Sequence, residues 1–230
     1  MSNKSHSVLT GVLLIATPIL FMTAFTMLQI NFEYPDILRQ PAMTVMQKFA
    51  AGGSGLIINW YLMVVSSILF IPISVMLHPY VAREDTPYMH VATTFGVAAG
   101  IVQMLGFIRW PFLVPTLAST YLDPSASEAT RAAIEVAFTA FNQYAGVGVG
   151  EHLGYLFTAL WSVLIGFAMM NSPRFSKWLG RTGIIFAAGI LVGTLESAGV
   201  PFVGLINAVS YIFWAIWMMV AGVNLLRSNG

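Results

Sequence analysis

Six uninterrupted apolar runs, each long enough to cross a lipid bilayer, dominate this sequence. A spanning helix needs about 20 apolar residues at a rise of about 1.5 Å per residue. The runs cover residues 8–30, 56–77, 91–114, 149–170, 182–200 and 202–226. Unsatisfied backbone groups are too costly in hydrocarbon and the runs are continuous rather than alternating, so each is predicted to be an α-helix. The chain is therefore predicted to form a single all-α, polytopic membrane domain over residues 1–230.

The composition requires a lipid solvent. Charged residues make up 8% of the chain and hydrophobic residues 57%, whereas charged residues average about 25% in soluble domains. Cysteine is absent, which excludes disulfides, thiolate metal ligands and a cysteine nucleophile. No basic surface interleaved with aromatic residues is present to indicate nucleic acid. We therefore expect the lipid bilayer, and no nucleic acid, as a partner.

The four histidines show no metal-binding pattern. His6, His78, His90 and His152 lack the helical or hairpin spacing of zinc ligands, so no metal site is predicted. The cofactor content stays open, including a single axial haem ligand at His152.

Two segments between spans are predicted to be amphipathic helices on the outer surface. The first begins near Pro41, places Met43, Met46 and Phe49 on one face, and ends at the glycine-rich break 52–55. The second begins with the capping-box pattern of residues 125–128. Apolar residues then follow at helical spacing, namely Ile134, Ala137, Phe138, Phe141 and Tyr144. Both segments are expected to cover the outer end of the bundle.

Lysine and arginine in the loops favour an orientation with both termini in the cytoplasm. In that orientation the basic residues of the inner side are Lys4, Arg83, Arg174, Lys177, Arg181 and Arg227. Those of the outer loops are Arg39, Lys48 and Arg131. Because basic residues concentrate in cytoplasmic loops, six against three supports this orientation.

Ionisable residues inside the predicted spans are the main candidates for a functional site. They are Arg109, Glu151, His152 and Glu196. A charge at the centre of a span costs about 2.5 to 3.5 kcal/mol on insertion scales, so such residues usually face the protein interior. Helix spacing places them, together with Asn59 and Asn207, roughly 5–10 Å from the outer boundary. Gln103 is expected to point inward on the face of the third span that carries Gly96 and Gly100.

This polar layer has a structural and a functional interpretation. In the structural one, Arg109 and Glu196 form an ion pair between the third and fifth spans, and Glu151 and His152 face water at the start of the fourth. In the functional one, the layer lines an outward-opening cavity that binds a small or lipid-like ligand or a partner helix. The alternatives are a structural subunit of a membrane complex and an intramembrane enzyme using Glu151 or His152 as acid or base. The sequence does not choose among them.

Residues 148–193 carry a series of short motifs made of small, apolar and polar residues. Its elements are Glu151–His152–x–Gly154, Leu160–Trp161 with Leu164–x–Gly166, Ser172–Pro173–Arg174, and Trp178–Leu179–Gly180. In these elements the chain resembles the DUF4386 family of bacterial six-helix membrane proteins. The resemblance implies a bacterial cytoplasmic-membrane protein with six spans, and it implies no activity.

Overall fold

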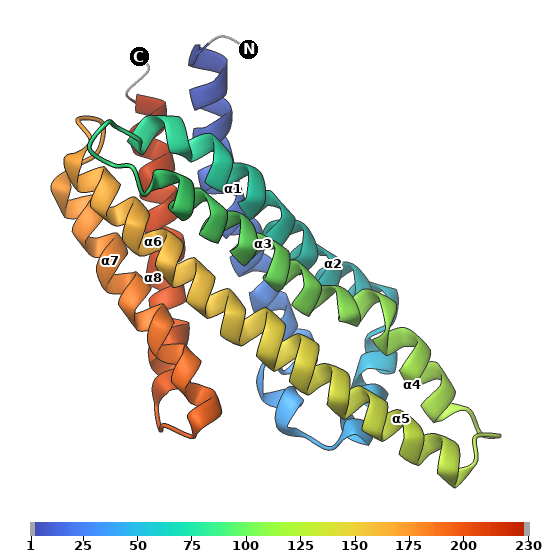
Figure 1. Cartoon of the computed structure of the whole chain (residues 1–230). Coiled ribbons are helices and arrows are strands. Elements are labelled where there is room, and N and C mark those ends of the chain that lie inside the picture. Colours follow the sequence, from blue (N-terminus) through green and yellow to red (C-terminus); the bar gives the residue numbers. More distant parts are fainter. Residues whose placement is uncertain (1–2, 228–230) are drawn as a thin grey trace.

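The computed structural model of the chain describes residues 3–227, which fold into helices and short connections (Figure 1). The α-helices are α1 (Asn3–Phe32), α2 (Ala42–Val81), α3 (Met89–Phe112), α4 (Val114–Leu122), α5 (Glu128–Phe141), α6 (Gly154–Asn171), α7 (Lys177–Val192) and α8 (Val203–Arg227). Two 3₁₀ segments, η1 (Asp36–Arg39) and η3 (Gly193–Ala198), and one π-helix, η2 (Asn142–Leu153), complete the fold.

Within residues 3–227, six helical rods are long and apolar enough to cross a membrane, which confirms the predicted all-α membrane fold. The rods are α1, α2, α3 with α4, α5 with η2 and α6, α7 with η3, and α8. They form a closed ring, because each of α1, α2, α3, α6, α7 and α8 packs on the next and α8 returns to α1. The ring has a termini end and an opposite end, here called the hairpin end, which carries η1, the α4–α5 connection and η3 (Figure 1).

The rods differ greatly in length. Helix α2 has 40 residues, and the rod from Glu128 to Asn171 has 44. At about 1.5 Å per residue, a 40-residue α-helix is roughly 60 Å long, twice the ~30 Å hydrocarbon core. Helices α4 and α5 consequently project past the ends of α7 and α8 at the hairpin end (Figure 1). Helices α4 and α5 together are here called the arm, which extends beyond the shorter α7–α8 pair (Figure 1).

The structure corrects one predicted helix boundary and agrees with another. Gly53 has φ 55° and ψ −150°, so α2 kinks at the glycine-rich break that the sequence indicated. The fourth span, in contrast, does not begin near residue 149, because α5, η2 and α6 form one continuous rod. Glu151 and His152 therefore lie within a long helix, and their predicted place at a helix start is wrong.

The second amphipathic segment is helix α5. Its N-cap is Ser127, whose side chain accepts a hydrogen bond from Thr130 N, so the cap lies two residues after the predicted Ser125. Ile134 and Phe138 are buried as the spacing predicts. Phe141, the last residue of α5, is 50% exposed, and Tyr144 is 75% exposed. Tyr144 lies beyond Asn142, where the hydrogen bonds change to the i→i+5 pattern of η2 and the α-helical spacing no longer applies.

An aromatic cluster fills the ring on the side of the hairpin end. The indole rings of Trp60 on α2 and Trp110 on α3 stack with their centroids 4.5 Å apart and their planes 7° apart. Phe32 packs edge-on against both rings, and Phe49 stacks on Trp110. Both indoles are fully buried, and neither Nε1 atom has a hydrogen-bond partner among the described residues. The cluster therefore depends on close packing rather than on polar contacts.

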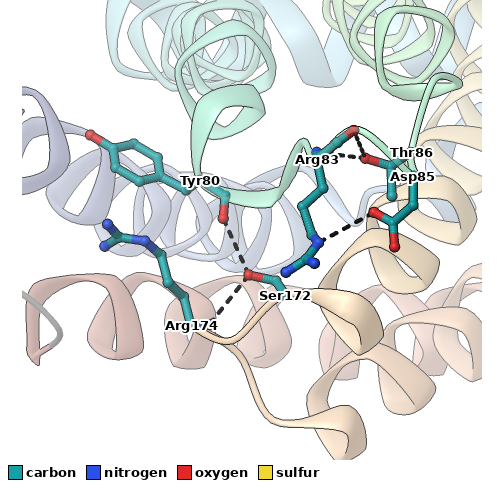
Figure 2. A network of polar contacts seen from close by, with 6 residues as sticks. All are labelled: Tyr80, Arg83, Asp85, Thr86, Ser172 and Arg174. Atoms are coloured by element: carbon teal, nitrogen blue, oxygen red, sulfur yellow. Dashed lines mark hydrogen bonds and ion pairs between the residues drawn. The ribbon is translucent and has the colours of Figure 1, made fainter.

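Polar contacts order the two loops of the termini end (Figure 2). Ser172, after α6, donates a hydrogen bond from its hydroxyl to the Tyr80 carbonyl at 3.4 Å and accepts one from Arg174 N at 3.3 Å. In the α2–α3 loop, the Arg83 backbone N–H donates to Thr86 Oγ1 at 2.7 Å, and Arg83 Nε contacts Asp85 at 3.2 Å. The Arg174 guanidinium also lies over the Tyr80 ring. The Ser172 and Arg174 contacts thus join the α6–α7 loop to the last turn of α2, and the Arg83 contacts stabilise the α2–α3 loop internally.

Candidate functional site

The π-helix η2 positions Glu151 and His152 and packs directly on α3. Gly150 meets Gly106 of α3 so closely that a Cβ atom at position 150 would lie 2.9 Å from the Gly106 Cα. Such an approach needs glycine on both helices. π-helical turns are rare and occur frequently at functional sites. The sequence missed this element, because several glycines near a polar pair also fit a break between two helices.

Arg109 connects η2 to α3 through hydrogen bonds. Its Nη1 donates to the Gly106 carbonyl, and its Nη2 donates to Asn142 Oδ1 at 3.0 Å. The guanidinium occupies the space beside Gly146 that a side chain would otherwise fill, and it lies 5.2 Å from the centre of the Trp110 ring. Arg109 is buried, so these oxygens replace the water that would otherwise solvate its donors. Its contacts hold the first turn of the π-helix against α3.

The predicted ion pair between Arg109 and Glu196 is wrong. Glu196 lies in η3, its side chain is 46% exposed, and its Oε1 is 3.5 Å from Nη2 of Arg39 in η1. The prediction that Glu196 faces the protein interior assumed an α-helix over residues 182–200, whereas α7 ends at Val192 and Glu196 lies in a 3₁₀ turn, which gives its side chain a different direction. The contact of Glu196 with Arg39 thus joins the 3₁₀ turns η3 and η1 rather than the third and fifth spans.

Glu151 is the least satisfied charged group at this end. It is half-buried and interacts electrostatically with Arg109, Glu196 and Arg39. Among residues 3–227, however, its carboxylate has no hydrogen bond and no ion pair within 4.0 Å. Both neighbouring arginines are engaged elsewhere, Arg109 with Gly106 and Asn142, and Arg39 with Asp36 and Glu196. His152 is also half-buried and has no hydrogen-bond partner in the same part of the chain.

Three tyrosines near Glu151 were missed by the sequence reasoning. Tyr155 lies one turn after Glu151 and interacts with it electrostatically, and its ring centroid is 5.7 Å from that of Tyr211 on α8. Tyr34 belongs to the connection between α1 and η1, outside the spans. Burial raises the pKa of its hydroxyl, the Glu151 charge raises the pKa further and Arg109 lowers it. Tyr34 thus interacts electrostatically with both Glu151 and Arg109. Of the three tyrosines, the sequence could have linked only Tyr155 to Glu151, because it lies four residues later on the same helix.

The three predicted amides each form a hydrogen bond between neighbouring helices of the ring. Asn59 on α2 donates to the Ala24 carbonyl on α1 at 3.1 Å, and Asn207 on α8 donates to the Ile190 carbonyl on α7 at 2.9 Å. Gln103 on α3 donates to Thr158 Oγ1 on α6 at 2.9 Å. The structure thus brings Arg109, Glu151 and Glu196 together with Arg39 and Tyr34, while Asn59, Gln103 and Asn207 bridge separate helix pairs.

No group of three His, Cys, Asp or Glu side chains within residues 3–227 is placed to hold a metal ion. The groups around Glu151 offer carboxylate oxygens, guanidinium donors and tyrosine rings. We call Tyr34, Arg39, Glu151, Tyr155 and Glu196 the Glu151 site.

Comparison with known proteins supports the family resemblance over far more of the chain than residues 148–193. The family model described as "Domain of unknown function (DUF4386)" matches residues 9–224, which include four spans entirely and most of the first and the last. No curated protein and no solved structure matches the chain.

Proposed function

The chain belongs to the DUF4386 family, and from this premise and its structure we propose that it binds a small or lipid-like ligand carrying a positive charge. The ligand would occupy the Glu151 site at the hairpin end. The observation that carries the proposal is the half-buried Glu151 carboxylate without a hydrogen-bond or ion-pair partner among the described residues. An ionisable residue within a span is a functional-site hypothesis by default.

The charge balance around Glu151 favours a cation over an anion. A buried charge is costly unless it is paired or hydrogen-bonded. Arg39 is shared between Asp36 and Glu196, and Arg109 contacts the neutral oxygens of Gly106 and Asn142, so neither guanidinium pairs closely with Glu151. An ammonium group beside Glu151 would supply the missing partner.

The aromatic groups favour an organic cation over a bare metal ion. Tyrosine rings attract cations over their faces within about 6 Å of the ring centre. Tyr155 and Tyr211 form an adjacent ring pair, and Tyr34 approaches from the α1–η1 connection. A carboxylate flanked by tyrosines matches the way proteins bind ammonium groups. Phe202, which is exposed at the η3–α8 turn of this end, offers apolar contact for the rest of a lipid-like ligand.

Ligand binding is testable with three probes of similar size and different charge: butylammonium, butanol and butyrate. We expect butylammonium to raise the Tm of the detergent-solubilised protein most. At a concentration of 100 Kd, a ligand stabilises the folded state by about 2.7 kcal/mol. Glu151→Gln should weaken butylammonium binding at least about tenfold, or ~1.4 kcal/mol, because it removes the ionic contact. In native mass spectra, the unmodified protein should carry bound butylammonium and the Glu151→Gln variant should not.

The matched control is Glu128→Gln, which changes the same residue type at the exposed start of the same rod. It should leave butylammonium binding unchanged. Equal stabilisation by butyrate and butylammonium would contradict the proposal, as would full butylammonium affinity in Glu151→Gln.

We further propose that the protein lies in a bacterial inner membrane with both termini in the cytoplasm. Six of the ten basic residues belong to the termini end, where Glu84 and Asp85 are the acidic ones. The other seven acidic residues lie toward the hairpin end, namely Glu33, Asp36, Asp123, Glu128, Glu135, Glu151 and Glu196. This uneven distribution of Lys and Arg supports a cytoplasmic termini end.

Single cysteines should report this orientation cleanly, because the chain has none of its own. Ser125→Cys lies in the α4–α5 connection and Ser176→Cys at the start of α7, and both positions are exposed. An impermeant maleimide added to intact cells should label Ser125→Cys, while Ser176→Cys should react only after the cells are opened. The reverse labelling pattern would contradict the proposed orientation.

A further inference from the structure

A small cavity lies inside the ring, between α1, α2, α3 and α8. Its volume is about 40 Å³. Phe21, Phe70 and Trp214 form part of its wall. Unusually for the middle of a membrane bundle, its lining also includes polar side chains from all four helices, namely Thr17, Ser66, Ser67, Gln103 and Tyr211.

Thr17 shows that the polar lining is incomplete. The residue is 5% exposed, and its Oγ1 has no hydrogen-bond partner among the described residues. The next residue, Pro18, has no N–H, so the Leu14 carbonyl one turn earlier receives no α-helical hydrogen bond from it. A buried hydroxyl without a partner costs about 1–3 kcal/mol. At the cavity, α1 therefore has one hydroxyl without a partner and lacks one backbone hydrogen bond.

We propose that this cavity is a hydration site in the middle of the bundle. A cavity needs at least about 10–15 Å³ to hold one water molecule, and this cavity exceeds that volume. A buried water needs two to four polar partners. Thr17 Oγ1 supplies one, and Ser66 and Ser67, which donate their own hydrogens to the Met63 carbonyl, keep oxygen lone pairs as acceptors. The Gln103 side chain likewise keeps its amide oxygen, because its nitrogen donates to Thr158.

The position of the cavity shows which side of the bundle these waters connect to. Toward the termini end, Trp161 packs edge-on against Phe70 and Trp217, and these rings belong to an apolar core. Toward the hairpin end, Tyr211 of the cavity wall pairs with Tyr155, which interacts with Glu151. The waters would thus extend a polar path from the Glu151 site to the middle of the bundle and stop at an aromatic barrier.

X-ray hydroxyl-radical footprinting of the detergent-solubilised full chain tests the inference, because radiolysis of a bound water oxidises side chains beside it. Met218 lines the cavity and is 1% exposed, whereas Met169 is 0% exposed and does not line it. We expect Met218 to oxidise several-fold faster than Met169. Thr17→Val should reduce this excess, because it removes a hydrogen-bond partner of the water. Equal oxidation of the two methionines in the unmodified protein would mean a dry cavity and overturn the inference.

Thermal stability supplies a second test, because Thr17→Val should change the Tm differently in a hydrated cavity and in a dry one. If the hydroxyl of Thr17 binds water, Thr17→Val loses that contact and its Tm stays level or falls. If the cavity is dry, Thr17→Val removes a buried, unpaired hydroxyl and its Tm rises, which would also overturn the inference. The control is Thr23→Val on the exposed face of the same helix. It corrects for the effect of valine on α1.

Discussion

Trp110→Ala is expected to cause the largest loss of stability among single core substitutions in this protein. Removing a fully buried indole leaves a cavity, and Trp→Ala changes in protein cores cost about 3–5 kcal/mol. The loss follows here from packing, because Trp110 contacts the rings of Trp60, Phe32, Phe49 and Phe138. Close-packed atoms lose dispersion contacts whether the surrounding solvent is water or lipid. Unfolding in mixed micelles provides the measurement.

Two further variants identify the origin of that loss. Trp110→Phe keeps an aromatic ring and removes an Nε1–H group that has no partner among the described residues, so it should cost less than about 1.5 kcal/mol. Trp178→Ala removes a tryptophan that is 70% exposed and should change stability by no more than about 0.5 kcal/mol. If Trp110→Ala were as mild as Trp178→Ala, the stacked pair would not support the fold.

Gly150→Ala is expected to destabilise the protein, whereas Gly148→Ala, two residues earlier in the same π-helix, is not. The new Cβ at position 150 would lie 2.9 Å from the Gly106 Cα and 3.3 Å from the Ala145 carbonyl, both of which are backbone atoms that cannot move aside. Overpacking of this kind costs about 1–3 kcal/mol. At position 148 the nearest atom is 3.6 Å away, so alanine fits there.

Tm values and mixed-micelle unfolding of both glycine variants measure this difference. Glycine within a helix costs roughly 0.8–1.0 kcal/mol relative to alanine, so Gly148→Ala should be neutral or slightly stabilising. Equal behaviour of the two variants would mean that η2 and α3 do not approach each other as closely as the structure has them.

The spans were predictable from the sequence because hydrophobic length is a strong local signal. Each apolar run exceeds what a soluble helix needs, and the kink at Gly53 follows from a residue that tolerates positive φ. The continuity of the rod through residues 142–153 was not predictable. Its glycines resemble a helix break in isolation, and only the close contact of Gly150 with Gly106 on α3 shows why glycine is required.

The partners of the charged residues were harder to predict than their presence. Arg109 was expected to need a carboxylate, but a guanidinium is also satisfied by neutral oxygens, here those of Gly106 and Asn142. Asn142 belonged to a segment assigned to a separate surface helix. The contact between Arg39 and Glu196 joins two short 3₁₀ turns, whose side-chain directions periodicity does not predict.

The π-helix also sets the direction in which the arm faces. In η2 each N–H bonds to the carbonyl five residues back, so one turn holds more residues than a turn of α6. Helix α5 is therefore rotated about the rod axis relative to an unbroken α-helix of the same length. On the rotated helix, Glu135 accepts a hydrogen bond at 2.6 Å from the Tyr121 hydroxyl of α4. The hydrogen-bond pattern of residues 142–153 thus sets the rotation of α5 about the rod axis relative to α6.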